Sequence, residues 1–402
     1  MNSIKGKIAI VGYGETPVSR ARESRGEPRL GWQEYLAWAA ELTLNSCNLS
    51  KKDVDGQGLA VTRIMPAPIF FGGEVAETLG ITPRVLITVD HGGASGAAML
   101  TQASFALNSG AADFVLCLAA ESPMTSVGGF SNPSADGHRR DYENPFGVMG
   151  PNSLFGLVMR RYMHEYGLNE QHMGKIALTQ RLHANLNPNA YFHNQPLTME
   201  EYLNSRMIAD PFRLLDCVMP VNGGLGLLVT TSERAKKMTE KPVYLLGFGE
   251  CDNYYHDGNR VRPDITYMGI RAASKSAHEM AGTTPNEMDF FQPYDDYTIA
   301  VLLQLEEAGF CEKRKGADYI DKTDISYKGD LPVNTGGGQI SSGQPGLAGG
   351  LVQIVEAVRQ LRNEGDKRQV KDCRIGMATG IGGFDYGRTI KNNIVLILGN
   401  KV

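Results

Sequence analysis

Residues 85–108 read VLITVDHGGASGAAMLTQASFALN, and this stretch decides the fold that we expect. Its opening residues are apolar or β-branched, which predicts a buried strand, and the apolar run after Gly96 predicts a helix. Gly92 and Gly93 indicate a tight turn between the two. A turn that opens a helix directs backbone N–H groups and the positive end of the helix dipole at one spot. We therefore expect an N–H cradle at Gly93 that binds a thioester oxygen or an enolate.

Both polar features of this turn have a plainer alternative. The glycines suit a tight strand–helix turn that binds no ligand. His91, which precedes them, is a candidate base, but a structural histidine with satisfied hydrogen bonds explains it equally well. Both alternatives stay open at this point.

The same order of elements occurs twice along the chain. A buried strand that ends in Gly-aromatic-Gly-Glu is expected at residues 7–15 and again at 243–250. The strand–turn–helix pattern quoted above returns at residues 331–361. Buried strands that alternate with helices are typical of α/β folds with parallel strands covered on both faces. We therefore expect an α/β protein built of two similar halves, residues 1–240 and 241–402.

The glycines of the first repeated strand invite a comparison with nucleotide-binding loops. Residues 12–17 read GYGETP, but Pro17 stands where a dinucleotide fingerprint needs its third glycine. The Gly-x-Gly pattern recurs at residues 247–249, which indicates a turn shared by both halves. We expect no nucleotide site here.

Residues 122–222 break the rhythm of strands and helices. The region is rich in Asn, Pro, His and Arg, with helical pieces at 153–166 and 172–184. We interpret it as an insertion that forms loops over one end of the sheet. Long loops of this kind usually serve as lids or binding surfaces.

The composition is that of an ordinary soluble enzyme. Of the 402 residues, 42% are hydrophobic and 21% are charged, and the net charge of -4 favours neither nucleic acid nor an anionic membrane as partner. The cysteines are scattered without zinc-ligand spacing, so we expect reduced thiols and no metal site. The apolar run at residues 8–12 is too short for a signal peptide, and no run is long enough for a membrane span. We expect a cytoplasmic protein.

Polar and glycine-rich segments follow several of the expected strands. Residues 293–298 read PYDDYT and place Tyr294, Asp295, Asp296 and Tyr297 at a helix start, where helix capping alone requires fewer polar groups. The other segments are NTGGGQ at 334–339, SSGQPG at 341–346 and TGIGGFDYG at 379–387. Ligands of open α/β sheets bind at the carboxyl ends of strands. We therefore expect these segments and the turns at 12–17 and 91–96 to meet on one face.

At these residues the chain resembles the thiolase superfamily, in particular the thiolase-like lipid-transfer proteins related to sterol-carrier thiolase. The resemblance runs from end to end and includes SRMIADPF at 205–212, LEEAGF at 305–310 and EAVRQLR at 356–362. It implies the duplicated five-layer αβαβα thiolase fold, a tight homodimer and an acyl-CoA ligand.

The chain departs from the family at every reactive side chain. Thiolases carry a nucleophilic cysteine where Gly93 stands and a histidine at or near the position of Tyr294. Their Gly-His-Pro motif is matched here by Gly-Gln344-Pro, and their Cys-x-Gly-Gly motif by residues 380–383, Gly-Ile-Gly-Gly. A chain without these cysteines has no thiolate for a covalent acyl-enzyme.

A similar loss is found in thiolase-like aldolases of steroid side-chain degradation. The resemblance therefore implies retro-aldol cleavage of a β-hydroxyacyl-CoA, in which coenzyme A is part of the substrate and no cofactor is bound covalently. It also implies a small partner protein with a zinc ribbon and an OB-fold that contacts the acyl-CoA.

Each polar residue of the expected site receives a role from this chemistry. Tyr294 is the expected proton-transferring group, oriented by Asp295 or Asp296. The N–H groups near Gly93 and Gly382 and the Gln344 amide are expected to hold the enolate oxygen. The remaining members of the expected site are Gly383, which lies in the same turn as Gly382, and His91, Tyr297 and Tyr386 as reserve proton-transfer groups.

Two other functions stay open. The first is an acyltransferase or thiolase that works with a partner subunit. The second is a non-catalytic subunit that binds acyl-CoA or lipid. The dense polar set at residues 294–297 favours catalysis, because a decayed site more often fills with apolar residues.

Overall fold

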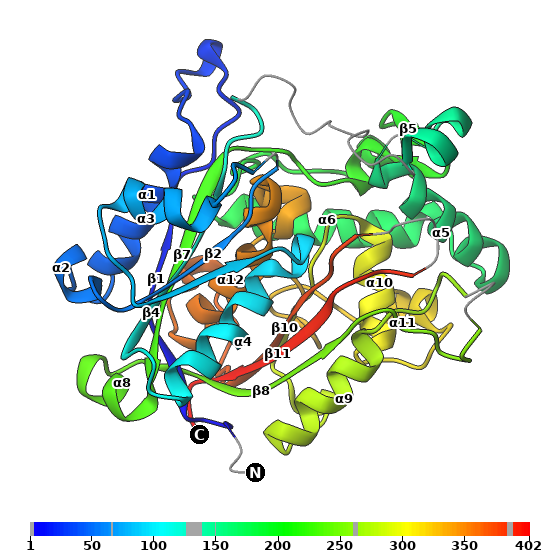
Figure 1. Cartoon of the computed structure of the whole chain (residues 1–402). Helices are drawn as coiled ribbons and strands as arrows, with labels where there is room; N and C mark the ends of the chain where they lie inside the picture. Colours follow the sequence, from blue (N-terminus) through cyan, green and yellow to red (C-terminus); the bar gives the residue numbers. More distant parts are fainter. Residues whose placement is uncertain (1–3, 66, 126–138, 149, 260–263, 384–388) are drawn as a thin grey trace.

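A nine-stranded mixed sheet forms the centre of the computed structural model, which describes residues 4–65, 67–125, 139–148, 150–259, 264–383 and 389–402 (Figure 1). Its strand order is β3-β2-β4-β7-β1-β8-β11-β10-β9. The strands are β1 Ile8–Glu15, β2 Gly58–Thr62, β3 Val85–Val89, β4 Phe114–Glu121, β7 Gly223–Thr231, β8 Val243–Cys251, β9 Phe290–Gln292, β10 Ile375–Gly380 and β11 Asn393–Gly399. A separate hairpin consists of β5 Met207–Ala209 and β6 Phe212–Arg213.

Strand pairing follows the same pattern outward from the centre in both directions. Strand β1 pairs antiparallel with β7, as β7 does with β4, whereas β2 and β3 continue in parallel. On the other side, β8 pairs antiparallel with β11 and β11 with β10, and β10 pairs in parallel with β9. A single parallel bridge from Phe291 to Val333 extends this series. The matching orders support the division near residue 240, which we keep as a proposal.

The expectation of parallel strands is wrong for the inner part of the sheet. Parallel neighbours need a long crossover between them, usually a helix. No helix lies between β10 and β11 among the described residues, and their pairing is antiparallel. Parallel pairing is confined to the outer strands on each side.

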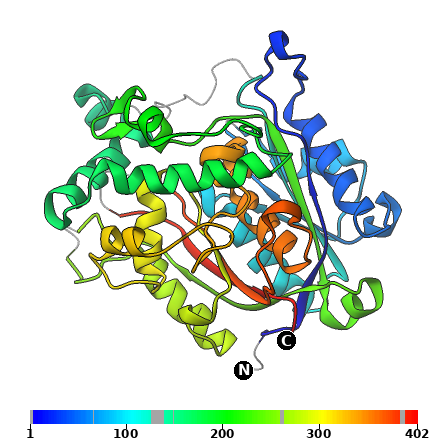
Figure 2. The ribbon, with the colours of Figure 1, turned by 180° about the vertical axis from the view of Figure 1, so that it is seen from behind.

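The bent sheet has two parts, β3-β2-β4-β7-β1 and β8-β11-β10-β9. Helices cover both faces of the sheet and also fill the space between these two parts. In the middle, α4 (Ser95–Asn108) and α12 (Val352–Leu361) each contact strands of both parts (Figure 1). On opposite flanks, α1 (Trp32–Asn45) packs on β1, β4 and β7, and α9 (Ile270–Ala281) packs on β8 and β11 (Figure 2). This is the αβαβα layering of the expected fold. The remaining helices of these layers are α2 Lys51–Val54, α3 Phe71–Leu79, α8 Ser232–Met238, α10 Thr298–Glu307 and α11 Gly316–Lys322.

The repeated Gly-x-Gly pattern lies within strands and does not form a turn. A Cβ on Gly14 in β1 would collide with Thr43 of α1, and a Cβ on Gly249 in β8 would collide with Ala273 of α9. These glycines therefore allow a helix to approach a strand closely, at equivalent places in the two halves.

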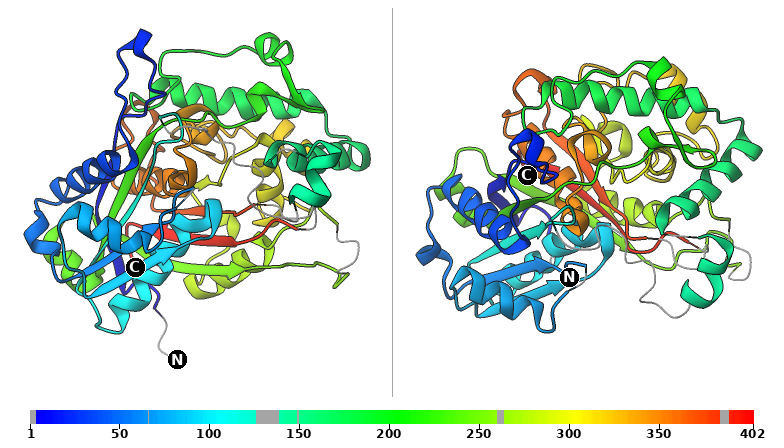
Figure 3. Two further views of the ribbon diagram at one scale, coloured as in Figure 1. Left: turned by 45° about the horizontal axis from the view of Figure 1, so that its top comes forward. Right: turned by 90° about the horizontal axis from the view of Figure 1, so that it is seen from above.

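The insertion is more helical than expected. It contains α5 (Pro151–Tyr166), α6 (Glu170–Leu186) and α7 (Met199–Leu203), which lie on the side of the sheet away from α1 and α3 (Figure 3). Asn169 caps α6, since its side chain accepts a hydrogen bond from the His172 N–H. Helix α6 packs on α10 and on the turn Gly338–Ser342, so the insertion braces one of the glycine-rich segments. Within the described residues, no helix is both long and apolar enough to span a membrane.

Candidate active site

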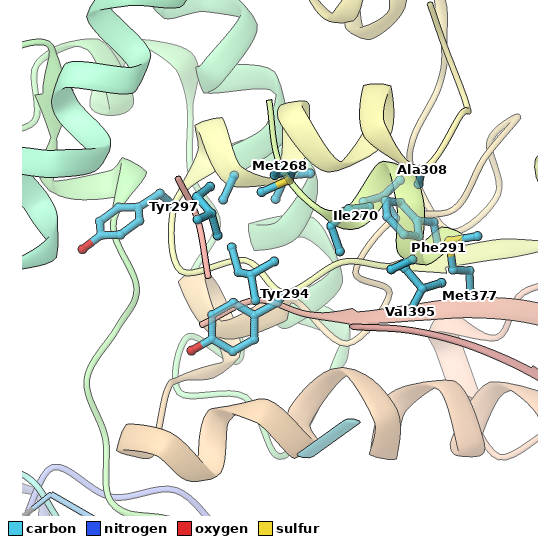
Figure 4. Close-up of a cluster of buried hydrophobic side chains, with 14 of the residues drawn as sticks. Met268, Ile270, Phe291, Tyr294, Tyr297, Ala308, Met377 and Val395 are labelled. Atoms are coloured by element: carbon cyan, nitrogen blue, oxygen red, sulfur yellow. The ribbon is translucent and has the colours of Figure 1, made fainter. Parts of the chain in front are cut away.

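Tyr294 lies in the short segment between β9 and α10, and its backbone is held by both neighbours. Its N–H donates to Thr379 Oγ1 of β10 at 3.0 Å, and its carbonyl accepts from Gln304 Nε2 of α10 at 2.7 Å. Only 4% of the residue is exposed, and the ring lies at the end of an apolar cluster (Figure 4). The strand and the helix thus give the phenol a fixed position.

The Tyr294 ring occupies the space that a side chain at position 93 would need. A Cβ built on Gly93 would collide with the Cζ and the phenol oxygen of Tyr294, and it would lie 2.5 Å from the Ile381 carbonyl. A cysteine at position 93 and this tyrosine are therefore mutually exclusive in this geometry. A phenol fills the space at the position where the resemblance places the nucleophilic cysteine of thiolases.

Gln344 donates a hydrogen bond to the phenol. Its Nε2 lies 3.0 Å from Tyr294 Oη. The Gln344 backbone is held on both sides, since its N–H donates to the Met219 carbonyl at 2.7 Å and its carbonyl accepts from the Val221 N–H at 3.1 Å. Because the phenol oxygen accepts from the amide, the proton of the phenol remains free to point at a substrate.

The electrostatics keep this phenol protonated. Burial raises the pKa of Tyr294 far above its usual range, and the nearby charge of Asp296 raises it further, whereas the Gln344 hydrogen bond lowers it only in part. A group with a raised pKa serves as a proton donor rather than as a base at neutral pH. The arrangement thus suits Tyr294 for donation to an oxyanion or a carbanion.

Asp295 points away from the phenol and into the glycine-rich segment. Its carboxylate accepts from the Gln339 N–H at 2.9 Å, the Ile340 N–H at 3.2 Å and Gln180 Nε2 at 3.1 Å. Burial raises the pKa of Asp295 to about 7, and these backbone N–H groups oppose that rise. Among the described residues, no hydrogen bond joins the Asp295 carboxylate to the Tyr294 phenol, and its hydrogen bonds hold the segment Gly338–Ser342.

Tyr297 has a structural setting. Its hydroxyl donates to Asn152 Oδ1 of α5 at 2.5 Å, and its ring stacks on Phe212 with a centroid distance of 5.1 Å. These contacts join the insertion to the start of α10. The hydroxyl is therefore engaged away from Gln344, which weakens its place among the reserve groups.

The last glycine-rich turn reaches the site but does not offer it the expected Gly382 N–H. The Gly382 N–H donates to the Lys391 carbonyl at 2.8 Å, and the Gly383 carbonyl accepts from the Lys391 N–H at 3.0 Å. Gly383 is exposed. The residues on either side of the β10–β11 connection pair with one another, so the Gly382 N–H is not available to an enolate. Tyr386 lies outside the described residues.

His91 lies at the mouth of the Gly93 turn with its ring turned toward β8. Its Nε2 is 3.5 Å from Glu250 Oε1, and its Nδ1 is buried without a hydrogen-bond partner among the described residues. The Gly93 N–H belongs to the first turn of the helical segment, where N–H groups have no acceptor within their own helix. The donor role expected of Gly93 is compatible with this position and stays a prediction.

Two supporting residues escaped the sequence analysis. Thr379 Oγ1 accepts from the Tyr294 N–H and donates to Gln304 Oε1 at 2.5 Å. Glu121, at the end of β4, accepts from the Leu347 N–H at 2.7 Å, and burial raises its pKa to about 7. Neither belongs to a recognisable motif, because each acts through contacts that only the fold creates.

The glycine-rich segments converge around Tyr294, with one exception. Gly93 and Gly350 are in close backbone contact, as are Gly380 and Ala94. The exception is the segment at residues 12–17, whose glycines pack against α1. In the part of the chain that the structure describes, no group of His, Cys, Asp and Glu side chains is arranged to hold a metal ion.

Comparisons with known proteins agree with this geometry. Residues 253–400 match the thiolase C-terminal domain-like family. Over 372 residues the chain is 32% identical to 17-hydroxy-3-oxo-4-pregnene-20-carboxyl-CoA lyase of Mycobacterium tuberculosis, which covers 89% of this chain and 92% of the relative. It is 34% identical over 312 residues to an acetyl-CoA acetyltransferase of Methanothermobacter thermautotrophicus, with 77% and 80% covered.

A solved structure described as an Ltp2-ChsH2(DUF35) aldolase is similar along the whole chain. The TM-score is 0.85 at 29% identity, and 99% of each chain is covered. The fold, the positions of the glycine-rich turns and these relatives define the class of protein. The chain belongs to the thiolase superfamily, among the thiolase-like proteins whose relatives include carbon–carbon lyases.

Proposed function

We propose that the protein cleaves the Cα–Cβ bond of a β-hydroxyacyl-CoA by a retro-aldol reaction. One observation carries this proposal. The buried phenol of Tyr294 fills the space beside Gly93, the position that corresponds to the nucleophile of thiolases. The hydroxyl proton leaves, a C=O forms at Cβ, and the electron pair of the broken bond becomes the enolate of a shorter acyl-CoA. That enolate is then protonated at Cα.

The residues around Tyr294 supply what the enolate needs. The Gly93 N–H and the positive end of α4 stabilise negative charge on the thioester oxygen. Tyr294, kept protonated by burial, donates the proton that the enolate takes up. Removal of one oxyanion donor typically costs about 3 to 4 kcal/mol in the barrier.

Acyl transfer through a cysteine of this chain has little support. Cys217 lies next to the polar segment, because its backbone pairs with that of Tyr297 in an isolated antiparallel β-bridge. Burial raises the pKa of Cys217 to about 12, and Asp216 and Asp296 add to this effect. A thiol with such a pKa is not a nucleophile at neutral pH.

The substrate class is a bulky acyl-CoA, such as the coenzyme A thioester of a steroid side chain. The name of the lyase from Mycobacterium tuberculosis and the aldolase structure support this assignment. The same structure is described with a DUF35 component, which supports a small partner subunit for this chain as well. We place the complex in the cytoplasm.

We also propose a homodimer that forms along β3. Among the strands that the structure describes, β3 is the last of the sheet and pairs only with β2. Leu86 of β3 is 45% exposed, and Ile69 and Phe70, which precede α3, are more than 80% exposed. An unpaired edge beside apolar side chains is a surface that a second copy covers well.

The test of the activity uses the wild-type protein, alone and with any small subunit that co-purifies from its native host. A panel of β-hydroxyacyl-CoA thioesters is offered, and products are identified by mass spectrometry. We expect equal amounts of a ketone or aldehyde and a shorter acyl-CoA. Tyr294→Phe should abolish cleavage while acyl-CoA binding and circular dichroism stay unchanged; retained turnover would remove Tyr294 from the mechanism.

One alternative activity has a specific observation in its favour. The acetyltransferase relative makes acyl transfer with the help of a partner subunit the second candidate. That activity moves a labelled acyl group to free coenzyme A, which the retro-aldol reaction does not do. A non-catalytic acyl-CoA-binding subunit would show neither product, and changes at Tyr294 and Gln344 would alter its affinity only.

A further inference from the structure

Two adjacent carboxylates in the segment between β9 and α10 have opposite surroundings. Asp295 is fully enclosed, and backbone and amide donors saturate its oxygens. Asp296 is partly exposed, and its Oδ1 is buried without a hydrogen-bond partner among the described residues. A buried carboxylate oxygen without a donor is costly, so each one in a natural structure calls for an explanation, such as a catalytic role or a bound water.

Among the residues that the structure describes, no Lys, Arg or His acts on the charge of Asp296. The titratable groups around it are Tyr294, Asp295 and Tyr297 of its own segment and Cys217 of the segment packed against it. Burial raises the pKa of Asp296 well above its usual range and Asp295 raises it further, opposed only by the backbone N–H groups of Asp296 and Tyr297. A carboxylate in such a setting is a stronger base than an ordinary aspartate.

The backbone brings Asp296 and Gln344 to the same place. The Asp296 carbonyl accepts from the Val218 N–H at 3.1 Å, and the adjacent residue Met219 accepts from the Gln344 N–H at 2.7 Å. One short segment, Cys217–Val221, is thus hydrogen-bonded to both residues. Asp296 and Gln344 are thus anchored to one segment, and the charge of Asp296 acts on the Tyr294 phenol that Gln344 contacts.

The direction of the Gln344 hydrogen bond leaves one role unfilled. Tyr294 is held as a donor, and its raised pKa makes it unsuitable for removing a proton from an alcohol at neutral pH. Retro-aldol cleavage needs such a base for the β-hydroxyl group. Asp295 is excluded because its oxygens already accept hydrogen bonds from the glycine-rich segment.

We infer that Asp296 is the general base that takes the β-hydroxyl proton, while Tyr294 donates to the enolate. This inference rests on the proposed retro-aldol function. The O–H bond of the substrate breaks and its proton goes to the Asp296 carboxylate; the O–H electron pair forms the C=O bond at Cβ. The Cα–Cβ pair moves to the enolate, which takes the Tyr294 proton at Cα. The Asp296 proton then returns to the phenolate, so both groups are restored.

The test compares Asp296→Asn with the wild-type enzyme on a cleavable β-hydroxyacyl-CoA. We expect kcat to fall by about 100-fold or more, the range typical for loss of a general base. The wild-type rate should fall as the pH falls through a value above the ordinary aspartate range of about 4, because Asp296 acts in its ionised form. That acidic limb should be absent from the residual activity of Asp296→Asn.

A matched control and a second reaction make the outcome specific. Asp321→Asn removes a carboxylate that pairs with Lys175 at the surface, and it should leave kcat and the acidic limb unchanged. Exchange of the Cα proton of the product acyl-CoA in D2O tests the return path, in which Asp296 takes the phenol proton and the phenolate takes the Cα proton. We expect Asp296→Asn and Tyr294→Phe both to lose this exchange and Asp321→Asn to retain it.

The possible results separate this inference from the proposed function. If the wild-type enzyme cleaves the substrate and Asp296→Asn keeps the acidic limb with a rate within a few-fold of wild type, Asp296 is not the base although the aldolase function stands. If the wild-type enzyme cleaves no member of the panel, the proposed function fails first. Should Asp296→Asn not fold, a wild-type rate that stays constant down to the ordinary aspartate range overturns the inference by itself.

Discussion

The phenol of Tyr294 and the missing side chain of Gly93 share one volume, although the two residues come from different halves of the chain. A cysteine at position 93 would displace the ring, and the ring leaves no room for a cysteine. The absence of a side chain at position 93 and the presence of a buried phenol beside it are therefore one structural feature. The proposed proton transfer by Tyr294 depends on this relationship.

Gly93→Ala tests this relationship directly. The added Cβ collides with the Tyr294 ring, so we expect cleavage to fall by about 100-fold or more and the free energy of unfolding to fall by about 1–3 kcal/mol. Steady-state kinetics and urea denaturation measure both effects. Gly73→Ala in α3 is the control, since a Cβ there meets nothing within 4 Å. A fully active Gly93→Ala enzyme would contradict the shared volume.

Gln344→Leu removes the amide that holds the phenol. The hydrogen bond from Gln344 Nε2 to Tyr294 Oη is lost, and the phenol is free to turn away from the substrate. A typical hydrogen bond contributes about 1 kcal/mol, so we expect kcat to fall by up to about 10-fold with little change in KM. Steady-state kinetics at saturating substrate provides the measurement. An unchanged kcat would show that the backbone alone positions Tyr294.

Glu356 should make the protein sensitive to acid. Although burial by itself raises its pKa, the charges of Arg368 and Arg359 outweigh burial and lower the pKa of Glu356 to about 2. A carboxyl whose pKa is lower in the folded state stabilises the fold above its unfolded pKa of about 4.3, and that contribution is lost as the pH falls toward 2. The shift corresponds to about 3 kcal/mol.

The measurement is the free energy of unfolding between pH 7 and pH 2. Glu356→Gln should be less stable than wild type at pH 7, and the difference should shrink as the pH falls. The same substitution at Glu279, an exposed residue that pairs with Lys275 on α9, serves as the control. A pH-independent difference would mean that Glu356 acts through packing rather than through charge.

Leu86→Glu tests the proposed dimer. A charge on the exposed face of β3 should prevent a second copy from adding its own edge strand. We expect light scattering to show a monomer for Leu86→Glu and a dimer for wild type. Leu182→Glu, on an exposed position of α6, is the control. A wild-type protein that is monomeric at all concentrations would remove the dimer proposal.

Much of the fold follows from local patterns. The strand, turn and helix at residues 85–108 appear as β3, the Gly92–Ala94 turn and α4, because apolar periodicity and glycine placement act over short distances. The antiparallel pairing of β10 with β11 was not expected. Strand direction depends on the path of the connecting chain, and hydrophobic periodicity carries no record of that path.

The candidate site, like the fold, could be predicted from the sequence only in part. Gly93, Tyr294 and Gln344 stand out in the sequence by residue type and by their place at strand ends, and the structure brings these three together. Gly382 stands out equally, but its N–H is taken by Lys391. Whether a backbone donor is free depends on which segment lies opposite, and that is a property of the folded chain.

By itself, the sequence determined the kind of scaffold and the loss of the thiolate, since both are matters of residue identity and short-range pattern. The folded chain alone shows that the Tyr294 phenol takes the place of the side chain absent from Gly93 and that Asp295 holds a glycine-rich segment. It also shows that Asp296 Oδ1 has no donor among the described residues. On an irregular segment, small backbone rotations turn the side chains of adjacent residues in different directions. Long-range packing sets those rotations.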